Sequence, residues 1–276
     1  MTDPNHLRAL FAARYPDPPQ PEGPVPDALA GMAARGSCRR FADRAVPDAL
    51  LETLCAVALA TPTKSDLQQR DIVLVTNPEA RARLAGLVSG QGWVAGAPVL
   101  AVFCGNNRRQ RLLHAWHGVA FANDHLDAFF NAAVDAGIAL AGFVTAAEAM
   151  GLGCCPISAV RNEAAAVSEL LGLPDHVFPV AGLAIGWPAA PPEIAMRLPL
   201  GATVHRDRYR EGDLRAEIAA YDTARAAHQP YTAQRFPDRF GASDTYGWSE
   251  DKARQYSAPE RADFGAFIRA KGFKLD

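Results

Sequence analysis

The sequence lacks several features that would assign its chemistry directly. It has no G-x-G-x-x-G fingerprint between a strand and a helix and no G-x-x-x-x-G-K-[ST] loop, which argues against a Rossmann dinucleotide domain and a P-loop hydrolase. It also has no G-x-S-x-G elbow, and no spacing singles out a serine–histidine pair. If the protein is an enzyme, we therefore expect a bound cofactor to carry the difficult chemical step.

Cysteine is sparse, and metal-binding patterns are missing. The five cysteines are an odd number, and none has C-x-x-C spacing, so neither a zinc site nor a disulfide framework is indicated. The adjacent Cys154 and Cys155 fit either a redox pair or two buried small side chains. His114, His117 and His125 cluster without the acid of an H-E-x-x-H motif, so we interpret them as solvated and expect no metal.

Charge and hydropathy exclude further classes. A net charge of −2 gives no general attraction to nucleic acid or anionic membranes. No basic-then-apolar signal opens the sequence. The most apolar stretch, Ala136 to Gly153, contains Glu148 and is expected to form a buried helix rather than a membrane span. These observations predict a cytoplasmic protein without a nucleic-acid or membrane partner.

Periodicity predicts both helices and strands. Strands are expected at Ile72–Thr76, Pro98–Cys104 and Phe178–Gly186, the second of them covered on both faces because its apolar run is continuous. A central helix is expected from about Asp124 to Met150. Shorter helices are predicted at residues 47–60, 78–88, 162–171, 214–227 and 259–271. The order is not a clean alternation, so a doubly wound parallel sheet is not required.

The chain divides into three parts. Residues 1–33 are expected to form a short helix and a Pro-rich arm, residues 34–200 a core, and residues 201–276 a C-terminal excursion. The last part has too little apolar content for a core of its own, so we expect it to wrap around another surface.

A basic loop is the strongest chemical signal. Arg35, Ser37 and Arg39 alternate, so an extended backbone would project them from one side. Guanidinium and hydroxyl groups suit phosphate oxygens, and Gly36 allows close backbone approach. Arg197, before a proline turn, is a second candidate clamp. A solvated basic loop remains the alternative.

Four motifs in order resemble the FMN-dependent nitroreductase superfamily. Arg35, Ser37, Arg39 and Phe41 match R-x-S-x-R-x-F, and ATPTKSDLQ matches the second signature. GLGCCPISAVRN and GLAIGWPAAPPEIAMRLPLGATVH resemble the third and fourth. SGQGWVAGAPVLAVFC and the later AAYD are similar to the branch of oxygen-insensitive NADPH nitroreductase A and flavin reductase P. The resemblance runs from about Ala34 to Asp222.

The resemblance implies a fold and an activity. The fold is α+β, a mixed sheet flanked by helices in an intertwined homodimer, with FMN bound by residues 34–200 and the C-terminal excursion wrapped around the partner subunit. The activity is NAD(P)H-dependent reduction of nitroaromatics, quinones or free flavin by two-step (ping-pong) electron transfer. Two alternatives remain: a flavin-binding redox protein with one specific physiological acceptor, and a non-enzymatic flavin-responsive module.

The resemblance also implies roles for particular residues. Arg35, Ser37 and Arg197 would hold the FMN phosphate and ribityl chain, whereas Arg39 and Gln91 would lie at the pyrimidine edge. The segment from Thr63 to Gln68 would reach the flavin from the partner subunit, and backbone groups of residues 157–159 would approach flavin N5. No side chain is expected to be catalytic. The full cofactor-binding set is Arg35, Gly36, Ser37, Cys38, Arg39, Thr63, Lys64, Ser65, Gln68, Gln91, Pro156, Ile157, Ser158, Ala159 and Arg197.

The sequence departs from the family pattern at several positions. Ala195 stands where the family has a phosphate-binding lysine, and Ser158–Ala159 replaces a glycine pair. Lys64 is a hypothetical substitute for the missing cation. Arg235 and Arg239 are candidates for the NADPH phosphate, although solvated loop arginines explain them equally well.

Overall fold

The computed structural model describes residues 1–88 and 90–276, and these residues divide into two compact units. Residues Met1–Gly36 and Glu193–Glu260 make up the first, here called the helical unit. Residues Ser37–Pro192 and Arg261–Asp276 make up the second, the sheet unit. The helical unit contains α1 (Pro4–Arg14), α2 (Asp27–Ala34), α8 (Leu200–Thr203), α9 (Leu214–His228), α10 (Pro237–Phe240) and α11 (Trp248–Gln255).

The sheet unit is built on four strands in the order β1-β2-β4-β3. Their bounds are β1 (Arg70–Val75), β2 (Val99–Asn106), β3 (Gly153–Ile157) and β4 (Val177–Gly186). The pairings β1–β2, β2–β4 and β3–β4 are all antiparallel. The β2–β4 register shifts after Phe103, where Cys104 faces Pro179, a residue without a backbone N–H to donate.

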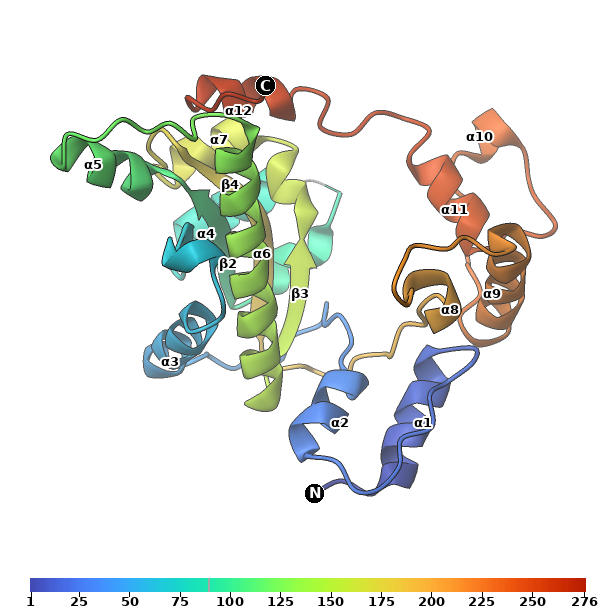
Figure 1. Ribbon diagram of the computed structural model, residues 1–276. Helices are drawn as coiled ribbons and strands as arrows, with labels where there is room; N and C mark the ends of the chain where they lie inside the picture. Colours follow the sequence, from blue (N-terminus) through green and yellow to red (C-terminus); the bar gives the residue numbers. More distant parts are fainter. Residues whose placement is uncertain (89) are drawn as a thin grey trace. The chain divides into compact units, whose positions relative to one another are not determined.

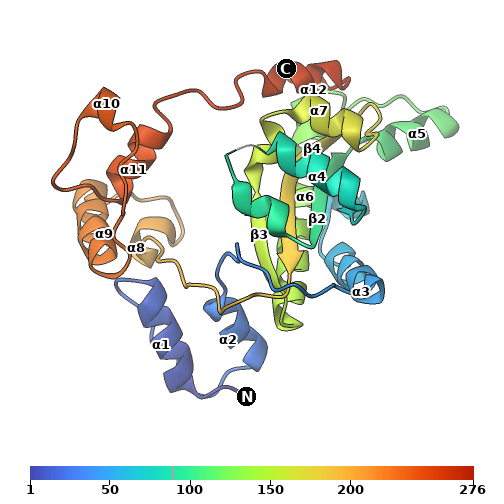
Figure 2. The same cartoon turned by 180° about the vertical axis from the view of Figure 1, so that it is seen from behind.

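Strand β2 separates two apolar layers. Val99, Ala101 and Phe103 belong to one buried cluster together with side chains of α3 (Asp48–Leu59) and α6 (Leu126–Ala149). The alternate residues belong to a second cluster with α4 (Pro78–Leu87) and α7 (Ala164–Leu170). Helices therefore cover both faces of the sheet, α6 in Figure 1 and α4 and α7 in the reverse view of Figure 2. The α+β class is confirmed, and all of β2 is buried as predicted.

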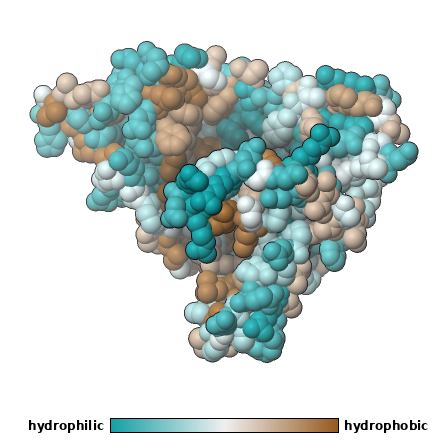
Figure 3. All heavy atoms as spheres, turned by 45° about the vertical axis from the view of Figure 1, so that its right-hand side comes forward, coloured by the Kyte–Doolittle hydropathy of each residue, from teal (hydrophilic) through white to brown (hydrophobic). Residues whose placement is uncertain are grey.

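Helix α6 is long and apolar enough to cross a membrane by length and composition alone. Its buried face, which includes Phe143 and the ionisable Asp135, packs in the core of the sheet unit. α12 (Phe264–Ala270) returns near the chain end, and its Ile268 packs with Ala132 of α6 and Phe178 of β4. Outside the core, hydrophilic residues make up most of the face drawn in Figure 3, with smaller groups of hydrophobic residues among them.

The remaining elements of the sheet unit are short. They are η1 (Lys64–Asp66), η2 (Gly92–Gly96), α5 (Arg108–Trp116) and η3 (Ser158–Arg161).

Several observed elements differ from the predicted ones. Helices α8, α10 and α11 were not predicted, and α12 begins at Phe264 rather than near residue 259. The three predicted strands and the central helix are present, with ends shifted by one or two residues. Strand β3 forms where a turn was expected, because Gly153–Ile157 pairs with β4 at the sheet edge. Helix α2 lies where the extended arm was expected to continue, and α5 was not predicted. The polar C-terminal excursion is divided: its part up to Glu260 forms one compact unit with the N-terminal 36 residues, whereas Arg261–Asp276 belongs to the sheet unit.

Candidate functional site

A cationic cavity of about 680 Å³ lies within the helical unit. Arg35 and Arg197, the two arginines of this unit predicted to bind phosphate, both line it. The full lining is Arg14, Tyr15, Met32, Arg35, Ala195, Met196, Arg197, Leu198, Leu200, Thr203, Tyr221, Arg225, Tyr231, Trp248 and Lys252. These residues include five cations, four aromatic rings and no acid. Such a lining favours an anionic ligand.

Arg14 ties together the two segments that carry these arginines. Its guanidinium, on a residue only 7% exposed, donates hydrogen bonds to the carbonyl oxygens of Ala33 (2.8 Å), Arg35 (2.6 Å) and Ala195 (3.1 Å). The Arg197 amide in turn donates to the Arg14 carbonyl at 2.7 Å. Sequence reasoning missed Arg14 because a basic residue in the last turn of a helix is ordinarily explained by the helix dipole and solvent.

The predicted loop Arg35–Arg39 is divided between the units after Gly36. In the sheet unit the Cys38 amide donates to the Cys154 carbonyl at 3.0 Å. The Cys38 side chain is 3% exposed, and a Cβ built on Gly153 would lie 2.6 Å from the Cys38 Cβ. Cys38 is thus a packing residue whose side chain and amide are both engaged within the sheet unit. The Arg39 guanidinium lies 5.8 Å from the Trp93 ring centroid, two residues beyond Gln91 in the chain.

The segment Thr63–Gln68 has a constrained backbone. Ser65, Asp66 and Gln68 all have positive φ, at 49°, 57° and 52°, a region that residues other than glycine rarely occupy. The Thr63 hydroxyl accepts a hydrogen bond from the Gln68 amide at 2.8 Å. Such local strain persists only where the surroundings impose it, and it is concentrated at functional sites.

The carboxylate of Asp135 imposes this conformation. Asp135 lies on α6 and is fully buried at 0% exposure. Its Oδ1 accepts the Lys64 amide and its Oδ2 the Gln69 amide, both at 2.9 Å. The two ends of the strained segment are therefore held by one buried side chain. Sequence reasoning missed Asp135, because an aspartate inside an apolar helix carries no motif that names its distant partners.

Lys64 and Ser65 line a second cavity, of about 290 Å³, within the sheet unit. Its other polar lining residues are mostly amides, with Asp127 and His114 among them: Gln69, Asn107, Gln110, His114, Asn123, Asp127 and Asn131. A polar environment of this kind suits the lysine side chain.

The remaining predicted residues lie just before η2, at the end of β3 and on η3. Gln91 precedes η2, and its carbonyl accepts the Val94 amide at 2.9 Å. Pro156 and Ser158 are exposed, whereas Ile157 and Ala159 are buried. The backbone at the end of β3, an edge strand, is therefore held from one side by Ile157, which pairs with Gly182 of β4.

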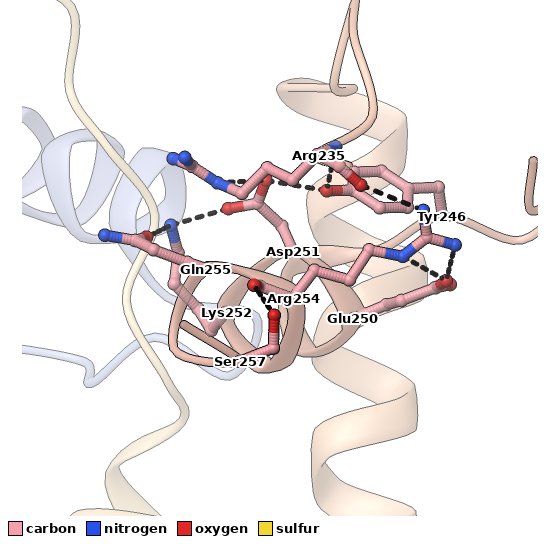
Figure 4. A network of polar contacts seen from close by, with 8 residues as sticks. All are labelled: Arg235, Tyr246, Glu250, Asp251, Lys252, Arg254, Gln255 and Ser257. Atoms are coloured by element: carbon pink, nitrogen blue, oxygen red, sulfur yellow. Dashed lines mark hydrogen bonds and ion pairs between the residues drawn. The ribbon is translucent and has the colours of Figure 1, made fainter. Parts of the chain in front are cut away.

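Arg235 takes part in an ion-pair network of the helical unit (Figure 4). Its Nε donates to Oδ1 of Asp251 at 3.0 Å, and Lys252 Nζ donates to Oδ2 at 2.6 Å. Burial works to raise the pKa of Asp251, but hydrogen bonds from Lys252 and Tyr246 outweigh it and hold that pKa below its usual value. Asp251 is therefore ionised at neutral pH and offsets part of the positive charge of Arg235 and Lys252.

The histidine cluster and the cysteine pair noted in the sequence do not form a metal site within the described residues. In the described part of the chain, no three His, Cys, Asp or Glu side chains are placed to hold a metal. His114 Nδ1 lies 3.2 and 3.1 Å from the carbonyl oxygens of Val119 and Ala120. Cys154 and Cys155 are buried side chains at successive positions of β3.

Comparison with known proteins gives a consistent result. The sequence model described as "Nitroreductase family" matches residues 32–187, and that of its C-terminal domain matches residues 196–276. The chain is 30% identical to FMN reductase [NAD(P)H] of Bacillus subtilis, over 91% of this chain and 99% of that protein. It is 37% identical to oxygen-insensitive NADPH nitroreductase of Salmonella typhimurium, over 69% and 78% of the two chains.

A solved structure has the same fold over nearly the whole chain. The structure titled NADPH:FMN oxidoreductase from Vibrio harveyi complexed with NAD+ superposes with a TM-score of 0.78 at 30% identity, covering 90% of this chain and 98% of that one. The superfamily expected from the four sequence motifs is thereby confirmed. The chain belongs to the nitroreductase family.

Proposed function

We propose that this protein reduces nitroaromatics, quinones or free flavin with NAD(P)H, by two-step (ping-pong) electron transfer. The protein is an FMN-dependent oxidoreductase, as the family match and its relatives named FMN reductase and NADPH nitroreductase indicate. The family match over residues 32–187 carries this conclusion. The range of acceptors and the order of steps are part of the proposal.

The charge of the helical-unit cavity fits the phosphate of FMN. A phosphate monoester is a dianion with strong acceptor oxygens, and the cavity lined by Arg35 and Arg197 contains no acid. We propose these two arginines as phosphate ligands, and Ser37 as the donor to the ribityl chain. A bound FMN supplies hydride acceptance and delivery at its N5 atom.

The sheet unit is proposed to hold and orient the flavin ring. Its contacts would come from Arg39, Gln91 and the backbone of residues 156–159, and the segment Thr63–Gln68 would reach the flavin of the partner subunit. The anchoring of Lys64 and Gln69 by Asp135 supports this assignment, because a segment held in one conformation loses little entropy on binding. None of these side chains is proposed as a general acid or base. Their proposed role is to position the flavin ring and to exclude water.

We further propose a homodimer in which residues 201–276 contact the partner subunit. Leu126, Phe130 and Val134 follow each other at i, i+4 and i+8 on α6 and are 49%, 58% and 40% exposed. An exposed apolar stripe of this kind is typical of a protein–protein interface. A cytoplasmic location is also proposed, since an odd number of cysteines without the spacing of a disulfide framework suits a reducing compartment.

Anaerobic spectroscopy and kinetics test the function. Purified protein should carry a flavin spectrum that NADPH or NADH bleaches and that a nitroaromatic, quinone or free flavin restores. Initial rates at several acceptor concentrations should give parallel double-reciprocal lines. Intersecting lines would contradict the two-step exchange, reoxidation by a single acceptor class would favour a specific redox protein, and absence of bleaching would favour a non-enzymatic module.

A further inference from the structure

One face of α9 packs against the segment that leads to Arg197. Tyr221 donates from its hydroxyl to the Met196 carbonyl at 3.3 Å. Two turns later, the Gln229 side chain accepts the Met196 amide at 3.2 Å and donates to the Ile194 carbonyl at 2.9 Å. Gln229 follows directly after the last residue of α9, whereas Tyr221 and Arg225, at i and i+4, share a face of the helix. Arg225, midway between Tyr221 and Gln229, therefore projects toward the same segment.

Among the residues that the structure describes, no acid forms an ion pair with Arg225. It lines the cavity together with Arg35 and Arg197. Its Nη1 donates to the Tyr221 hydroxyl at 3.3 Å, and its guanidinium lies 5.6 Å from the Tyr231 ring centroid. Within residues 1–88 and 90–276 it forms no ion pair, and its buried Nε has no acceptor. A guanidinium fork in this state is suited to bind phosphate oxygens.

Two further cations of the cavity lining, Arg14 and Lys252, already bind groups of the protein. Arg14 donates to three carbonyl oxygens. Lys252 Nζ pairs with the buried Asp251 at 2.6 Å and also donates to Gln255. Ala195, which shares the cavity wall, contributes no charge. The sequence motifs assign Arg35 and Arg197 to the phosphate. Among the other three cations of the lining, Arg225 is thus the best suited to bind an anionic ligand.

We propose that Arg225 is a third ligand of the phosphate monoester of FMN, completing a site with Arg35 and Arg197 in the helical-unit cavity. This inference rests on the proposed use of FMN. Arg225 determines specificity for the phosphorylated flavin, because riboflavin presents the same ring and ribityl chain without the dianion. The Tyr231 ring beside the guanidinium keeps it in place by a cation–π contact.

Paired titrations with FMN and riboflavin isolate the phosphate contribution. Full-length protein stripped of flavin is titrated with each, following flavin fluorescence, for wild type, Arg225→Met, Arg225→Lys and Arg208→Met. Arg208 is an exposed arginine of the same unit outside the cavity lining, so its loss alters net charge equally. We expect Arg225→Met to weaken FMN binding by roughly tenfold or more, since charge-assisted hydrogen bonds have this magnitude.

The other measurements decide between explanations. Riboflavin affinity should stay within about twofold of wild type in Arg225→Met, which also shows that the variant is folded, and Arg225→Lys should retain part of the preference for FMN. An unchanged ratio of FMN to riboflavin affinity in Arg225→Met overturns the inference while leaving the proposed function intact. The same holds if Arg208→Met loses as much FMN affinity as Arg225→Met. A wild-type protein that binds neither flavin overturns both.

Discussion

Both carboxylate oxygens of Asp135 on α6 accept backbone amides, and one of these, from Lys64 at 2.9 Å, belongs to a residue 71 positions earlier in the chain. The other comes from Gln69. The fully buried Asp135 side chain is tolerated because these amides satisfy both of its oxygens. The central helix thus determines the conformation of the segment proposed to contact the flavin.

Replacing Asp135 by asparagine should disturb this segment selectively. Asparagine has nearly the same shape, but its amide would oppose one of the two N–H donors, which costs about 1–3 kcal/mol of unfolding free energy. We expect that loss in urea denaturation, together with several-fold weaker FMN binding in a fluorescence titration. Glu169→Gln, an equal charge change at an exposed position of α7, should alter neither. If Asp135→Asn is destabilised but binds FMN with normal affinity, Asp135 stabilises the fold and does not contribute to FMN binding.

Replacing Arg14 by lysine, although it keeps the positive charge, should destabilise the fold. A planar guanidinium can donate to three carbonyl oxygens at once, whereas an ammonium group on a different stem cannot match that geometry. Arg14→Lys is expected to lower the unfolding free energy by about 2 kcal/mol, because buried carbonyl groups lose their donors. The control is Arg8→Lys on the same helix, where the arginine donates to the Asn5 side chain and to the Pro21 carbonyl. Equal small effects in both would argue against the role assigned to Arg14.

The start of α6 should contribute stability that disappears in acid. Hydrogen bonds from Arg111 and Lys274 outweigh partial desolvation and lower the pKa of Asp124 to about 2, from an ordinary value of 3.8. Because the folded-state pKa is the lower one, the stabilisation is present above about pH 4 and lost as pH falls toward 2. We expect Asp124→Asn to lose about 1–2 kcal/mol at pH 7 after allowing for solvent screening.

Urea denaturation of both proteins at pH 7, 4 and 2.5 checks this dependence. The difference between wild type and Asp124→Asn should shrink steadily below pH 4. Asp43→Asn, at an exposed aspartate whose carboxylate has no partner in the described ranges, should differ little from wild type throughout. A difference for Asp124→Asn that is constant across the three pH values would contradict the electrostatic explanation.

The α6 stripe gives a test of the dimer. Phe130 is 58% exposed in one chain, so glutamate there should be harmless to the fold of the subunit but costly at an apolar interface. We expect Phe130→Glu to shift the mass measured by light scattering from dimer to monomer, and Phe130→Leu to remain dimeric. A wild-type monomer, or a dimeric Phe130→Glu, would exclude this stripe from the interface.

The amino-acid sequence by itself determined the family, the cofactor class and the course of the main elements. Apolar periodicity predicts α6, and the continuous apolar run predicts the fully buried β2. The motif around Arg35 and the segment leading to Arg197 carry recognisable chemistry because their residue types and spacing are local properties.

Only the tertiary structure decided which residues support those motifs. Arg14, Asp135 and Arg225 belong to no motif, and each acts on atoms far away in the sequence: the Ala195 carbonyl, the Lys64 amide and the cavity of Arg197. Strand β3 likewise exists because β4 pairs with it. Hydrogen bonding of a buried group depends on what packing brings within about 3 Å of it, and local sequence contains no information on that distance.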